Sequence, residues 1–160
     1  MITQDWKGIR SITVFVSVVV PLWLFFLLTS CSLPNLEPPD CTAARDRVRE
    51  FYSFHLGNDM HPTLENVRLR ERFLTRDHAA RLALDAGGMA PTKSDYFTHS
   101  EDFPKTFRVG ECKVIDPGKV TQLEIVLFWK DDTRSEQKEM LAIAKYENND
   151  WLIDSVGPKP

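Results

Sequence analysis

The residues best suited to acid–base chemistry are Tyr52 and His55, with Asp95, Glu101 and Asp102 later in the chain. Tyr52 and His55 are three residues apart, a spacing that places two side chains on one face of a helix. Such groups act as general acids and bases when a partly apolar pocket shifts their pKa values. They equally suit a structural role, as a core aromatic and a histidine whose charge favours a helix C-terminus. We expect the structural role, and we assign no catalytic residue.

Two other groups with chemical potential are weaker. The segment His99–Asp102 (His-Ser-Glu-Asp) contains the residue types of a hydrolytic triad, but a fold assembles triads from separated segments. We expect a solvated loop, with Asp95 capping a turn and Phe97 buried beside it. Neither a metal site nor another cofactor is predicted, because no metal-binding spacing links the four histidines, His55, His61, His78 and His99.

The N-terminus has the pattern of an export signal. Lys7 and Arg10 outweigh Asp5 in a short polar stretch, residues 12–28 are almost wholly apolar, and small residues follow. A positive region, an apolar run and small residues are typical of a secretory signal peptide. An uncleaved membrane helix is the alternative, since the run has about the minimum length that spans a bilayer, roughly 17–20 residues.

The end of the apolar run, Leu28-Thr29-Ser30-Cys31, resembles the lipobox of bacterial lipoproteins. This resemblance implies that residues 1–30 are removed and that Cys31 carries the lipid that binds the membrane. Several acyl chains on one residue hold a domain stably on a bilayer. Ser32 follows the cysteine, and in Gram-negative lipoproteins a residue other than Asp implies transport to the outer membrane, facing the periplasm.

Length and charge then limit the mature chain. Cleavage leaves 130 of the 160 residues, enough for one domain with its own core. The leader carries two basic residues and one acidic residue, so the charge of −3 for the whole chain becomes −4. Without a basic patch or polybasic run, nucleic-acid binding is not expected.

Cys41 and Cys112 remain once Cys31 is lipidated. An even pair in an oxidising compartment suggests a disulfide, which would close a long loop. Two buried free thiols are the alternative, because spacing alone does not show that the sulfurs meet.

The rest of the chain is organised as helices followed by strands. A Pro-rich tether covers residues 31–41, and Asp40 or Thr42 is expected to cap the first helix. A long crossing follows the helices over residues 89–106. The pattern predicts an α+β fold with helices at 42–56, 64–69 and 76–85 and strands at 107–115, 120–130, 138–146 and 151–156.

Four short motifs carry a family resemblance: residues 48–56, 73–75, 95–97 and 149–156. Together they resemble the nuclear-transport-factor-2-like superfamily, and within it a bacterial family of often lipid-anchored domains. The resemblance implies that residues 42–157 form a cone, in which a curved antiparallel sheet wraps around the N-terminal helices and encloses a cavity.

From these features we expect a non-enzymatic, membrane-anchored envelope lipoprotein that binds or supports another envelope protein. The alternative is a binder of a small apolar ligand, or an acid–base enzyme, that uses an interior cavity at Tyr52, His55 and Asp95.

Overall fold

The structure is a computed structural model that describes residues 37–89 and 92–160. The expected signal peptide and the lipidation site at Cys31 lie outside the described residues. Within the described ranges, none of the helices has the length and apolar character needed to cross a membrane.

The first described helix, α2 (Pro39–Leu56), is amphipathic. Its buried residues are Cys41, Ala44, Val48, Phe51, Tyr52 and His55, which confirms the predicted apolar face. The helix begins earlier than expected, with Pro39 in its first turn, where proline's missing N–H costs no intrahelical bond. The last three residues assigned to the tether, 39–41, are therefore helical. The expected caps Asp40 and Thr42 are wrong, because both lie inside the helix and Pro38 is the N-cap.

Three shorter elements follow: α3 (Leu64–Arg70), the 3-10 turn η1 (Glu71–Phe73) and α4 (Arg76–Ala86). Thr63 caps α3, and Thr75 caps α4 by accepting a hydrogen bond from the backbone N–H of His78 at 3.3 Å. The predicted cap at Thr75 is thus confirmed. Such a bond satisfies one of the backbone donors left free at a helix start.

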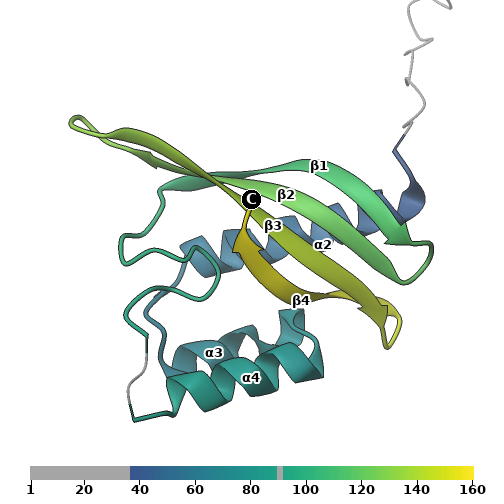
Figure 1. Ribbon diagram of the computed structural model, residues 1–160, viewed down its shortest axis with the longest axis horizontal. Helices are drawn as coiled ribbons and strands as arrows, with labels where there is room; N and C mark the ends of the chain where they lie inside the picture. The colour runs from purple at the N-terminus through teal and green to yellow at the C-terminus, as the bar shows by residue number, and fades with distance from the viewer. Residues whose placement is uncertain (1–36, 90–91) are drawn as a thin grey trace, which may run out of the picture. The chain divides into compact units, whose positions relative to one another are not determined.

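Four strands then form one antiparallel sheet in the order β1-β2-β3-β4. They are β1 (Thr106–Asp116), β2 (Val120–Lys130), β3 (Ser135–Glu147) and β4 (Asp150–Pro158). Alternate residues of β2 are buried, which confirms the predicted core stripe of Leu123, Ile125, Leu127 and Trp129. The β2–β3 hairpin extends past the paired ends of β1 and β4 (Figure 1).

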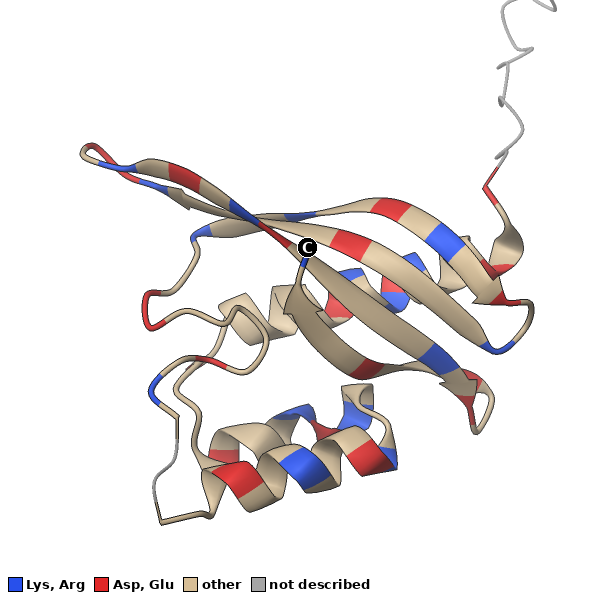
Figure 2. Ribbon diagram, viewed as in Figure 1, with Lys and Arg blue, Asp and Glu red and all other residues tan. Residues whose placement is uncertain are grey.

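Helix α2 lies across one face of this sheet, while α3 and α4 pack against each other and α4 contacts β4 (Figure 1). Aromatic rings fill the space between α2, η1 and the crossing segment, with Phe51 in edge-on contact with Phe73 and Phe97. Basic and acidic residues are interspersed over the described helices and strands (Figure 2). The predicted α+β class is confirmed.

Candidate functional site

The structure brings Tyr52, His55 and Asp95 together, and it buries all three. Tyr52 and His55 are fully buried on α2, and Asp95 is 3% exposed. The ring nitrogen Nε2 of His55 lies 3.1 Å from Oδ1 of Asp95, and the Tyr52 hydroxyl donates to the carbonyl oxygen of Phe97 at 2.9 Å. Burial raises the pKa of the Tyr52 phenol, so this side chain stays neutral.

Arg70 completes the cluster. Its guanidinium, on a side chain that is 1% exposed, donates from Nε to Nδ1 of His55 at 2.7 Å. Sequence reasoning missed it, because a charged residue is expected at the surface. The available signal was its position three residues after the buried Val67, on the same face of α3.

This arrangement determines where the imidazole proton lies. Arginine has no lone pair to accept with, so Nδ1 of His55 is the acceptor and the proton is on Nε2, which donates to Asp95. Burial lowers the pKa of His55, in agreement with a neutral ring. A carboxylate and a guanidinium are therefore linked through a neutral imidazole.

Asp95 also organises the crossing segment. Its Oδ1 accepts hydrogen bonds from the backbone N–H groups of Phe97 and Thr98 at 2.9 and 2.7 Å. Burial acts to raise the pKa of Asp95, but the hydrogen bonds from His55 and from these amides prevail and lower it. The prediction that Asp95 caps a turn beside a buried Phe97 is confirmed.

The cluster leaves no room for a ligand. The space that adjoins Asp95 and Arg70 measures about 10 Å³, roughly the size of one water molecule. Small-molecule sites are typically about 300–1,000 Å³. The polar groups of this cluster bond to one another and to backbone carbonyls, so the cluster joins α2, α3 and the crossing segment as a structural unit.

The residues of the His99–Asp102 segment do not converge. Nε2 of His99 lies 3.1 Å from the carbonyl oxygen of Val156, whereas Asp102 forms an ion pair with Arg134 in the β2–β3 hairpin. His99, Glu101 and Asp102 are exposed, as predicted for a solvated loop. This segment carries no catalytic triad.

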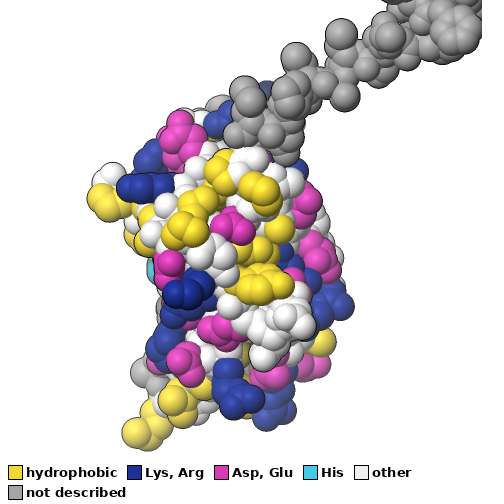
Figure 3. All heavy atoms as spheres, turned by 90° about the vertical axis from the view of Figure 1, so that its right-hand side faces the viewer, with side chains coloured by type: hydrophobic (Ala, Val, Ile, Leu, Met, Phe, Trp, Pro, Cys, Tyr) yellow, Lys and Arg dark blue, Asp and Glu magenta, His cyan; other side chains and the backbone are white. Residues whose placement is uncertain are grey.

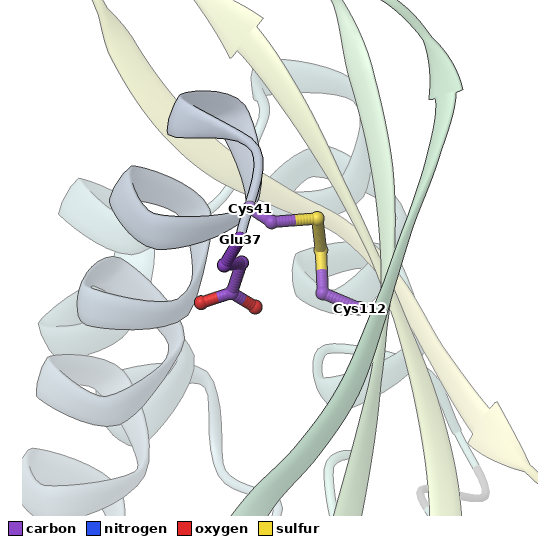
Figure 4. Close-up of side chains that lie close together, drawn as sticks. All are labelled: Glu37, Cys41 and Cys112. Carbon is purple, nitrogen blue, oxygen red and sulfur yellow. A yellow bond between two sulfur atoms is a disulfide. The ribbon is translucent and has the colours of Figure 1, made fainter. Parts of the chain in front are cut away.

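Cys41 and Cys112 form a disulfide that joins the first turn of α2 to β1 (Figure 4). Glu37 lies beside the two sulfurs, so the three side chains have the residue types of a metal site. The sulfurs are bonded to each other, however, and a metal binds the thiolate form of cysteine. The Glu37 carboxylate forms an ion pair with Arg45, which lowers the pKa of Glu37. This arrangement is therefore a covalent and ionic anchor for α2.

Arg45 extends this anchor to the edge of the sheet. Its guanidinium donates to the carbonyl oxygens of Val109 and Gly110, where the pairing of β1 with β2 shifts register. A bulge of this kind interrupts the row of free backbone groups on an edge strand and so discourages pairing with other sheets.

No family model matches the chain. No curated protein matches it either. The fold is similar to that of one chain in the crystal structure of the type VI native effector–immunity complex Tae3–Tai3 from Ralstonia pickettii, with a TM-score of 0.55 and 20% sequence identity. The similarity covers 76% of this chain and 95% of that chain, and at this identity it shows a shared fold.

Proposed function

We propose that this chain is a lipid-anchored protein of the bacterial cell envelope whose α+β domain binds another protein. Its structural neighbour comes from an effector–immunity complex, and we propose that this chain has the immunity role in a complex of that kind. The observation that carries this proposal is the likeness of its fold to a chain that works in a two-protein complex.

The candidate residues in the interior of the domain are occupied by hydrogen bonds to other groups of the protein, which favours binding of a partner at the surface. Tyr52, His55 and Asp95, the residues that a cavity-based activity would use, are hydrogen-bonded within the core, and the space that adjoins Asp95 measures about 10 Å³. We therefore do not propose the alternative of a small apolar ligand or an acid–base reaction at these residues.

The expected lipid anchor at Cys31 supports the immunity role. The apolar run that ends at Leu28-Thr29-Ser30-Cys31 matches a lipoprotein signal, and Ser32 favours the outer membrane and the periplasm. A protein held by lipid in the membrane of its own cell suits a resident binding protein better than a released effector. The proposal retains the resemblance to lipid-anchored members of the nuclear-transport-factor-2-like superfamily, which the order of helices before a four-stranded antiparallel sheet supports.

The test is purification of the full chain from envelopes in mild detergent, followed by mass spectrometry of the proteins and small molecules that accompany it. We expect one protein in stoichiometric amount that is missing when an unrelated lipoprotein is purified in parallel. A bound small molecule without a protein partner would overturn the proposal, as would turnover of a substrate by the purified chain.

A further inference from the structure

An open groove of about 730 Å³ lies between η1, α4 and the β3–β4 turn. Its apolar lining consists of Leu74, Leu152 and three alanines of α4, Ala79, Ala80 and Ala83. Because alanine side chains are short, another chain can approach the helix closely here. The end of the sheet that carries the β3–β4 turn faces the viewer in Figure 3, where hydrophobic side chains lie among charged ones.

Arg47 links the two sides of this groove, η1 and the start of β4, and fixes them relative to each other. The guanidinium of Arg47 on α2 donates to the carbonyl oxygen of Arg72 in η1 at 2.6 Å and pairs with Asp150, the first residue of β4, at 3.0 Å. Asn148 and Asn149 at the tip of that turn have φ values of 54° and 65°, as in the tight turns that suit a twisted hairpin. A groove with fixed walls loses little conformational entropy when a partner binds.

The rim of the groove is predominantly acidic. Glu71, Asp77 and Glu147 contribute three exposed carboxylates, against one guanidinium from Arg76. Over residues 37–89 and 92–160, none of these three carboxylates forms an ion pair. Figure 2 shows acidic positions in the β3–β4 turn and along α4.

We propose that this groove is the binding surface for the protein partner, and that it receives a segment with a lysine or arginine side chain among apolar residues. This inference rests on the proposed function. The aliphatic stem of such a side chain covers an apolar floor while its charged end stays at a polar rim. Leu74, Ala80 and Leu152 provide the floor, and the free carboxylates at the rim provide the complementary charge.

The test is selection of peptides from a phage-displayed library of random short sequences on the purified full chain in detergent. We expect the selected peptides to be enriched in lysine or arginine next to apolar residues. Their binding to the unmodified chain should weaken with added salt, because salt screens the attraction between opposite charges. Their binding to the Glu71→Lys/Asp77→Lys variant should be at least about tenfold weaker than to the unmodified chain. Glu147→Lys, at the exposed end of β3 and outside any helix, serves as the second variant.

The charge-matched control is Glu65→Lys/Asp132→Lys. Both positions are exposed, and Glu65 occupies a helix first turn as Asp77 does, so the control reproduces the loss of a carboxylate near a helix N-terminus. This control should bind the selected peptides as the unmodified chain does. Circular dichroism shows whether each variant is folded.

Three outcomes would overturn the inference: no peptide is selected, the selected peptides lack basic residues, or basic peptides bind the groove variants and the control equally well. If a stoichiometric partner still accompanies the chain from envelopes in any of these cases, the proposed function stands and the assignment of the groove fails. If no partner accompanies the chain, the proposed function itself fails.

Discussion

Removal of the disulfide between Cys41 and Cys112 should strongly destabilise the domain. The bond joins residues 71 apart in the sequence, and for a loop of this length the loss of unfolded-state entropy corresponds to about 4.4 kcal/mol at 25 °C. We expect Cys41→Ala/Cys112→Ala to lower the free energy of unfolding by about 4 kcal/mol. Domains of this kind have a total stability of roughly 5–15 kcal/mol, so the change consumes a large fraction of it.

Urea titration of the full chain in detergent measures this loss. Trp129 and Trp151 are 7% and 5% exposed, so their fluorescence changes when the core opens. Unfolding of the oxidised chain with and without a phosphine reductant isolates the cross-link from the loss of the sulfur atoms. The dependence on urea should also steepen after reduction, because the unfolded chain then exposes more surface.

The alanine variant is the control for this experiment, since the reductant should leave its unfolding midpoint unchanged. A destabilisation below about 1 kcal/mol in the reduced chain would refute the reasoning, because the loop-entropy argument predicts several times more. It would mean that the reduced, unfolded chain keeps enough structure for the cross-link to add little constraint.

Three further predictions concern the buried cluster around His55 and the expected lipid attachment at Cys31. Asp95→Asn should cost about 1–2 kcal/mol of unfolding free energy in urea titration, because the amide oxygen can replace Oδ1 and accept the same three hydrogen bonds but lacks the charge that strengthens them; an unchanged midpoint would contradict a charged Asp95 in the folded chain. The free energy of unfolding should fall as pH drops below the ordinary histidine pKa of 6.5, because the unfolded chain binds a proton there while burial lowers the pKa of His55 and keeps it neutral in the folded chain. His55→Gln should make the fall in unfolding free energy between about pH 7 and 5 less steep. An equally steep fall in this variant would count against a neutral, buried His55. Cys31→Ala should leave an uncleaved or soluble, mislocalised precursor, and unchanged mass and membrane fractionation would refute lipid attachment.

Local signals in the chain were enough to predict the class and order of the elements. Alternation of apolar residues in β2 defined a strand with one buried face, and Thr75 marked the start of α4. These features depend on neighbours a few residues away, so periodicity and capping rules identify them. The start of α2 at Pro39 was missed because Pro34, Pro38 and Pro39, in a stretch without apolar periodicity, suggested a tether.

The relation between distant residues came from the tertiary structure alone. The fold placed Arg70 of α3 within hydrogen-bond distance of His55 on α2. The three candidate catalytic residues thereby became part of a buried hydrogen-bond network with a neutral imidazole at its centre. The fold likewise brought the Cα atoms of Cys41 and Cys112 to 5.7 Å, which the spacing in the chain left open. The groove exists because η1 and α4 contact β4, about seventy residues later in the chain. Periodicity indicates which side of a helix or strand is buried. It does not indicate which other segment packs against that side, because this depends on contacts between residues far apart in the sequence.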